Sequence, residues 1–165
     1  MRRLFLPLVF VLTLLVVLLS GSEFRAQEHP GEHPGREERI RPNQVREAIL
    51  DYIRWDTKLK GGYFLIWDDE EQRVWKLGFS ELHEKVMVLE DGTYFMCTDF
   101  NAQEKQPDGS LKTDTLDIDF WLEEQEDGTL KVSMIKIHKV RGVRRFRYEA
   151  DKIKPVRQRK NEKYP

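Results

Sequence analysis

The chain has 165 residues, of which 35% are charged and 39% hydrophobic, and its formal net charge at pH 7 is −1. This length accommodates one ordinary domain with appendages, and the composition excludes a wholly disordered chain. The single cysteine, Cys97, excludes an internal disulfide, and the small net charge argues neither for nor against a nucleic-acid partner.

The N-terminus has the three parts of an export signal. Two arginines precede the apolar run Leu4–Leu19, and three small residues, 20–22, follow it. As a helix this run spans about 24 Å, short of the roughly 30 Å hydrocarbon layer of a membrane, so cleavage is favoured over a permanent anchor. We predict that residues 1–22 are a signal peptide cut after Ser22, with an inner-membrane anchor through residues 4–19 as the alternative. Both place the rest of the chain in the periplasm or another extracytoplasmic compartment, where a nucleic-acid partner is not expected.

The next segment, residues 23–41, contains a tandem repeat, Glu28-His29-Pro30-Gly31 followed by Glu32-His33-Pro34-Gly35. Proline fixes φ and glycine loosens the chain, so neither a helix nor a strand is expected to propagate here. We interpret the segment as a flexible spacer. The alternative is a weak divalent-metal site at His29 and His33, because imidazole and carboxylate groups suit divalent transition metals.

Residues 42–150 are predicted to form the folded domain, which opens with one helix from about Asn43 to Lys58. Asn43 is the expected N-cap, and Gly61-Gly62 is the expected end, since glycine adopts left-handed conformations at little cost. Five apolar residues recur at helical spacing and give the helix one apolar face; they are Val45, Ala48, Ile49, Tyr52 and Ile53.

The rest of the domain has the alternation and turn signals of antiparallel strands. Four strands are expected at residues 63–67, 73–79, 85–89 and 93–100, then a loop at 101–114, a long hairpin from Thr115 with a turn at 126–128, and a last strand near Val143–Tyr148. A shift in the apolar set of the returning hairpin strand indicates a bulge near Met134. The predicted fold is α+β, with one N-terminal helix packed on a curved antiparallel sheet of about six strands, a cystatin-like or nuclear-transport-factor-like plan.

The spacer repeat followed by Asp117–Glu124, Asp127–Val132 and Ile137–Phe146 resembles a group of uncharacterised exported bacterial envelope proteins. The resemblance covers residues 28–148. It implies an extracytoplasmic location and brings no known activity with it.

One constellation in the hairpin carries chemistry. Asp117 and Asp119 share a strand face that Trp121 continues, and His138 on the partner strand comes within reach if the bulge realigns the register. Carboxylates and imidazole can hold a divalent metal or move a proton, and a pocket is then expected between the helix and this face. Alternatively, the aspartates face water and pair with Lys136 or Lys139.

Neighbouring residues extend this hypothesis. Asp99 is expected to approach from the adjacent strand and His83 from a loop, whereas Cys97 is expected to be a buried small hydrophobe rather than a nucleophile. No local motif of a metal-binding CxxC, phosphate loop or serine nucleophile is present.

Two functions of different classes follow. The first is an exported, non-enzymatic envelope module that binds a protein, peptide or small ligand. The second is a metal-binding or hydrolytic domain that uses Asp117, Asp119 and His138. The basic tail, residues 151–165, is expected to be disordered and, with the N-terminal segment, able to contact anionic lipid head groups.

Overall fold

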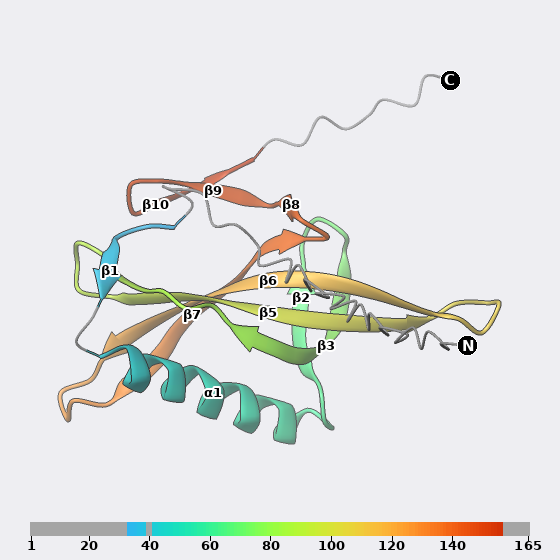
Figure 1. The fold of residues 1–165 in the computed structure, drawn as a ribbon, viewed down its shortest axis with the longest axis horizontal. Helices are drawn as coiled ribbons and strands as arrows, with labels where there is room; N and C mark the ends of the chain where they lie inside the picture. Colours follow the sequence, from blue (N-terminus) through green and yellow to red (C-terminus); the bar gives the residue numbers. More distant parts are fainter. Residues whose placement is uncertain (1–32, 39–40, 157–165) are drawn as a thin grey trace, which may run out of the picture.

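The computed structural model describes residues 33–38 and 41–156, and these residues form one helix and ten strands (Figure 1). The elements are β1 (Arg36–Glu38), α1 (Pro42–Leu59), β2 (Phe64–Asp68), β3 (Arg73–Leu82), β4 (Val86–Val88), β5 (Tyr94–Lys105), β6 (Leu111–Glu124), β7 (Leu130–Val140), β8 (Val143–Arg144), β9 (Phe146–Glu149) and β10 (Lys152–Pro155). The predicted α+β plan, one helix on an antiparallel sheet, is confirmed. The cystatin-like or nuclear-transport-factor-like plan stays a prediction.

The first eight strands belong to one sheet with the order β1-β4-β5-β6-β7-β8, to which the β2–β3 hairpin is joined through β3 and β5. Strands β9 and β10 form a separate two-stranded sheet. Figure 1 shows α1 on one side of β5–β7 and the β9–β10 hairpin on the other. The central strands are therefore covered on both faces.

The helix begins one residue before the predicted N-cap. Arg41 is the N-cap and Pro42 starts the helix, so the prediction that Asn43 caps it is wrong. Proline is favoured at this position because its φ is already helical and its missing N–H would have no partner there. The predicted end is confirmed: Gly62 has a positive φ, and its N–H donates to Thr57 O at 2.9 Å.

The two faces of β6 bury different sets of residues, as its alternation predicts. The helix-side core contains Val45, Ile49, Ile53, Leu116, Ile118, Phe120 and Leu122 among others. The opposite face carries a second cluster of Phe95, Cys97, Trp121 and Phe146, with Tyr148 and Ile153 packed against it. The C-terminal hairpin thus supplies the cover for the face that holds the predicted site.

Two bulges interrupt the β6–β7 pairing. Trp121 pairs with Met134 and Leu122 with Val132, which leaves Ser133 as the extra residue and confirms the predicted bulge near Met134. A second, unpredicted bulge lies where Asp117 pairs with Lys139 and Ile118 with Ile137, and its extra residue is His138.

The segment between β5 and β6 contains more β-structure than expected. The predicted loop at 101–114 is wrong, because β5 and β6 pair as far as Lys105 and Leu111 and only the intervening residues turn. Its proline and glycine mark that tight turn alone.

The expectation of no strand within residues 23–41 is wrong for β1, which pairs with β4 immediately after Gly35. The expectation of disorder from residue 151 is wrong for β10, because Ile153 packs against the second cluster and β10 pairs with β9.

The predictions for residues 1–32 and 157–165, including the signal, His29 and the end of the basic tail, lie outside the described residues. Within residues 33–38 and 41–156, no helix has both the length and the apolar character needed to cross a membrane.

Candidate metal centre

The register of β5 and β6 places the polar residues of the second face side by side. Cys97 pairs with Asp119, and Asp99 pairs with Asp117. From β7, His138 Nδ1 lies 3.5 Å from Asp119 Oδ2 and 3.6 Å from Asp117 Oδ2. The structure therefore brings together three of the four residues predicted for a binding site.

These side chains are buried. The exposed fraction is 0% for Asp119, 7% for Asp117 and 1% for His138. The alternative that the aspartates face water is therefore wrong, although Lys139 Nζ does lie 3.2 Å from Asp117 Oδ2. The predicted location between the helix and this face is also wrong, because even-numbered β6 residues, such as Ile118, face the helix.

Trp121, the fourth predicted residue, lies farther along the same face. Its ring packs edge-on against Phe95, with the centroids 5.1 Å apart, and tilts toward Tyr148 at 6.4 Å. It forms part of the apolar wall of the cluster.

Cys97 is buried, as expected, but its thiol is part of a polar network. The thiol donates to Asp119 Oδ1 at 2.9 Å, and the Tyr148 hydroxyl donates to Asp119 Oδ2. The interpretation of Cys97 as a plain hydrophobe missed these contacts.

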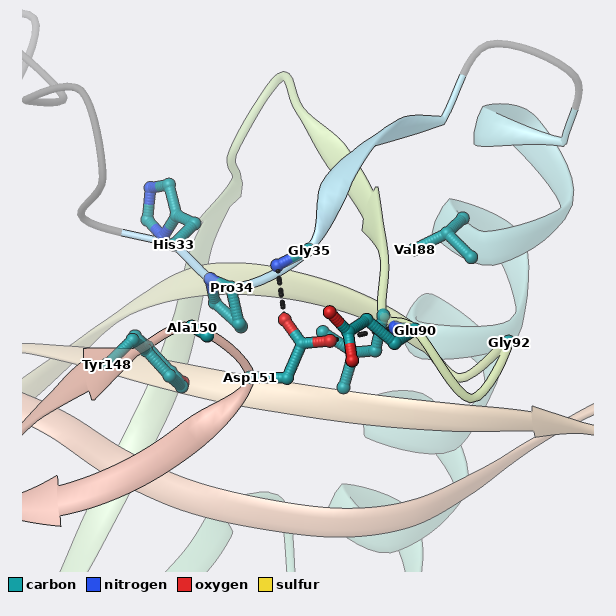
Figure 2. Close-up of a pocket in the computed structure, with 10 residues that line it drawn as sticks. His33, Pro34, Gly35, Val88, Glu90, Gly92, Tyr148, Ala150 and Asp151 are labelled. Carbon is teal, nitrogen blue, oxygen red and sulfur yellow. Dashed lines mark hydrogen bonds between the residues drawn. The ribbon is translucent and has the colours of Figure 1, made fainter.

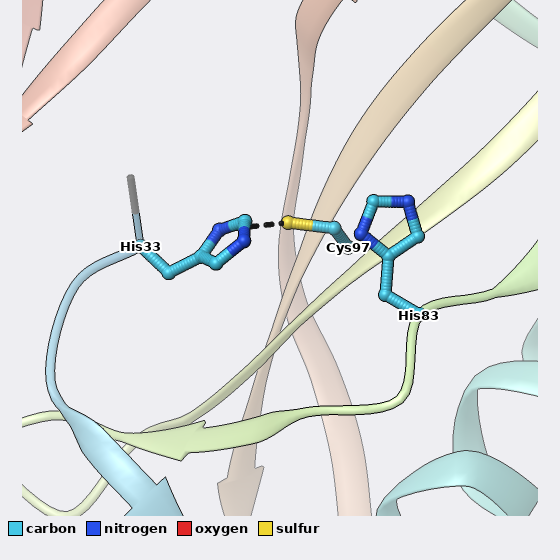
Figure 3. Close-up of side chains that lie close together, drawn as sticks. All are labelled: His33, His83 and Cys97. Carbon is cyan, nitrogen blue, oxygen red and sulfur yellow. Dashed lines mark hydrogen bonds between the residues drawn. The ribbon is translucent and has the colours of Figure 1, made fainter. Parts of the chain in front are cut away.

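Two histidines from outside β5–β7 approach the same thiol (Figure 3). His33, in the segment that precedes β1, places Nδ1 3.3 Å from Cys97 Sγ. His83 follows β3; its backbone N–H donates to Cys97 O at 3.1 Å, and its Nε2 lies 3.3 Å from Asp99 Oδ1. The expected approach of His83 and Asp99 is confirmed, whereas the proximity of His33 to Cys97 was not predicted.

Three overlapping sets of potential ligands result, and in each set the donor atoms all lie within 4.8 Å of one another. The sets are His33, His83 and Cys97; Cys97, Asp117, Asp119 and His138; and His83, Asp99 and Asp117. Ligands of a tetrahedral zinc ion lie about 3.5 Å apart, given bond lengths of about 2.0–2.3 Å. Small side-chain movements would therefore bring any of these sets to coordination distance.

Burial dominates the electrostatics of the network. It raises the pKa of Asp119 well above the ordinary value, and the nearby charge of Asp117 raises it further. Burial also raises the pKa of Asp117, against the opposing effect of Lys139. The pKa of the Cys97 thiol is raised well above normal by burial and by the two aspartates. The metal-free site therefore favours protons on groups that a cation would need deprotonated.

The raised pKa of Asp119 gives a prediction for the metal-free protein. Its contribution to stability is present below the ordinary pKa of 3.8 and is lost as the pH rises through the higher folded-state pKa. Asp119→Asn cannot ionise, so at pH 8 it should raise the unfolding free energy relative to the parent by about 1–3 kcal/mol, the cost of a poorly compensated buried group. Chemical unfolding between pH 5 and 8, with chelator present, measures this.

Asp127→Asn is the matched control for that prediction. The Thr129 side chain and backbone N–H hydrogen-bond to Asp127 and lower its pKa, so its contribution is lost only as the pH falls. The difference in unfolding free energy between this variant and the parent should stay constant from pH 5 to 8. If the difference in unfolding free energy between Asp119→Asn and the parent were also constant over this pH range, that would contradict a raised pKa for Asp119.

An open groove adjoins the cluster (Figure 2). Its cavity volume is about 590 Å³, and its lining includes His33, Pro34, Leu89, Tyr148 and Asp151. His33 and Tyr148 also contact the network, through Cys97 and Asp119 respectively. The groove is therefore a route by which a small ion could reach the buried donors.

The chain matches no protein-family model, no curated protein and no solved structure. The resemblance to exported envelope proteins stays a prediction.

Proposed function

We propose that this domain is an extracytoplasmic binding module for a transition-metal ion of the zinc class, held by Cys97, His33 and His83. The observation that carries the proposal is the convergence of these three donors, from three separate parts of the chain, to within 4.8 Å of one another. Thiolate and imidazole are the ligand types that zinc prefers.

Asp117 is the best-placed fourth ligand. Its donor oxygens group with Cys97 in one set and with His83 in another. Its Oδ1 is buried and accepts no hydrogen bond from the described residues. A carboxylate oxygen in that position is costly unless a cation or a donor compensates it.

Asp119 would act as a positioning residue for Cys97. In the metal-free chain it accepts the thiol hydrogen bond. When the thiol loses its proton to a bound metal, a protonated Asp119 can donate to the sulfur instead, with Tyr148 holding the second carboxyl oxygen. The raised pKa of Asp119 supports this reversal.

The set of Cys97, Asp117, Asp119 and His138 is the less favourable alternative. It would combine a thiolate with two carboxylates, three negatively charged ligands in a buried site. The set with His33 and His83 uses two neutral imidazoles and adjoins the groove. Neutral imidazoles add no negative charge to a buried site, which lowers the cost of desolvation.

Cobalt(II) titration of the full-length, chelator-treated protein tests the proposal, because a cobalt–thiolate bond gives a charge-transfer band. We expect the band in the parent and in His138→Gln at similar cobalt concentrations, whereas His83→Ala should need at least about 100-fold more cobalt to develop it. No band in the parent, or a cobalt affinity that falls in His138→Gln but not in His83→Ala, would contradict the assignment.

A further inference from the structure

The three residues before β1 lie against one surface, and the position of Gly35 admits glycine alone. Gly35 has φ +75°, and a Cβ there would lie 2.4 Å from Val88 O and 2.7 Å from Val88 C. Its N–H donates to Asp151 Oδ1 at 2.8 Å. Only glycine fits this position, because the left-handed φ and the backbone contact both exclude a side chain.

The preceding two residues also contact this surface. Pro34 is buried and lines the groove of Figure 2, and proline loses little conformational freedom when it is ordered. His33 reaches Cys97 Sγ and packs against the Phe95 ring, with centroids 5.9 Å apart. A His-Pro-Gly sequence therefore meets the glycine requirement of this surface and places an imidazole at Cys97.

The residues that surround His33, Pro34 and Gly35 also hydrogen-bond to one another, independently of these three residues. Asp151, in the β9–β10 turn, uses its second oxygen to accept the N–H of Glu90 at 2.7 Å (Figure 2). The β4–β5 turn and the β9–β10 turn are thus linked to one another. We call the surface formed by Val88, Glu90, Cys97, Tyr148 and Asp151 the HPG socket.

The sequence supplies this ligand twice, since Glu28-His29-Pro30-Gly31 repeats Glu32-His33-Pro34-Gly35 residue for residue. We propose that the HPG socket is a peptide-binding site for His-Pro-Gly segments and that Glu28–Gly31 of the same chain is its alternative occupant. When Glu28–Gly31 replaces Glu32–Gly35 in the socket, the chain loses at most the three residue pairs between β1 and β4, at the edge of the sheet. The contacts belong to the metal-free chain, so the inference does not rest on the metal.

The exchange would change the reach of the chain while keeping a histidine at Cys97. For the alternative in which residues 4–19 remain as a membrane anchor, Glu28–Gly31 in the socket makes the segment leading back to that anchor four residues shorter. Four extended residues span about 13 Å, so the distance from the domain to that anchor would change by up to this length. The repeat would then set two tether lengths for one domain.

Thiol labelling tests the proposal, because Cys97 is the only cysteine in the chain. Labelling rates are measured for the full-length parent, Gly31→Ala, Gly35→Ala and the double variant, all with chelator. Gly31→Ala should react at the parent rate, and Gly35→Ala within about threefold of it, because Glu28–Gly31 fills the socket. The double variant should react at least about tenfold faster than Gly35→Ala, since coupled sites are not additive.

A synthetic Gln-Glu-His-Pro-Gly-Glu peptide should slow the labelling of the double variant, and the same peptide with alanine for glycine should not. This rescue, with a far-UV spectrum like that of the parent, shows that the socket is folded. If the double variant loses that spectrum, His29→Ala combined with Gly35→Ala provides the same comparison without altering Gly31.

Equal labelling rates for the double variant and Gly35→Ala, whether both are parent-like or both are fast, would overturn the proposal. If the protection of Cys97 from labelling in Gly35→Ala depended on protein concentration, the occupant of the socket would come from a second copy of the chain. That result would contradict exchange within one chain. Because metal is absent throughout, failure here leaves the cobalt experiment unaffected.

Discussion

Cys97→Ser is expected to reduce zinc affinity at least about 100-fold, because a serine hydroxyl does not deprotonate near neutral pH and makes a poor zinc ligand. At a zinc concentration 100 times the dissociation constant of the parent, binding stabilises the parent by about 2.7 kcal/mol but the variant by no more than about 0.4 kcal/mol. Chemical unfolding with and without zinc measures both values.

The metal-free stability provides the control for Cys97→Ser. A serine hydroxyl can still donate to Asp119, as the thiol does, so the unfolding free energy with chelator should change by less than about 1.5 kcal/mol. Equal stabilisation of the parent and the variant by zinc would contradict a role for Cys97 as a ligand.

Asp68→Ala is expected to destabilise the domain by about 3–5 kcal/mol, the cost of breaking a buried ion pair. Asp68 is 3% exposed and accepts hydrogen bonds from the Trp75 indole at 3.0 Å and from Arg145 Nη2 at 2.9 Å. It also accepts the N–H groups of Glu70 and Glu71 at 2.9 and 3.1 Å. Alanine would leave the buried indole without this acceptor and the partly buried guanidinium with only Glu70 and Glu71 as partners among the described residues. Urea unfolding at pH 7 measures the change.

The pH dependence of the same variant has the opposite sign to that of Asp119→Asn. Burial alone would raise the pKa of Asp68, but its hydrogen bonds and the Arg145 charge outweigh burial and lower it. Its stabilisation is present above the ordinary pKa of 3.8 and is lost as the pH falls through the folded-state pKa. The difference between the parent and Asp68→Ala should therefore shrink in acid.

Asp69→Ala is the matched control for Asp68→Ala. The neighbouring carboxylate is exposed and accepts only the exposed Trp67 indole N–H among the hydrogen bonds described. Asp69→Ala should lower the unfolding free energy by less than about 1 kcal/mol. If Asp68→Ala lowered the unfolding free energy as little as Asp69→Ala does, the network of Asp68 and Arg145 would contribute little to stability.

Local patterns were sufficient to predict the α+β plan of one helix on an antiparallel sheet. The alternation of Ile118 and Phe120 with the aspartates assigned the two faces of β6, and the shift after Met134 located one bulge. The β1 and β10 strands were not predictable, because both are short and their pairing depends on partners distant in sequence or on packing against the second cluster.

The candidate site was only partly predictable for the same reason. The spacing of Asp117 and Asp119 revealed a shared face, but burial of that face depends on the C-terminal hairpin, whose Tyr148 and Phe146 close over it. Proline and glycine next to His33 favoured a flexible spacer. In the structure the same two residues fit a specific surface, and the repeat of the tetrapeptide was the one local signal of that role.

X-ray absorption at the zinc edge of the full-length protein, loaded with one equivalent of zinc, tests the central claim most directly. The metal site assigned to Cys97, His33 and His83 predicts one sulfur ligand at about 2.3 Å together with scattering from two imidazoles. A shell of oxygen and nitrogen without sulfur, or with one imidazole and several carboxylates, would contradict that assignment.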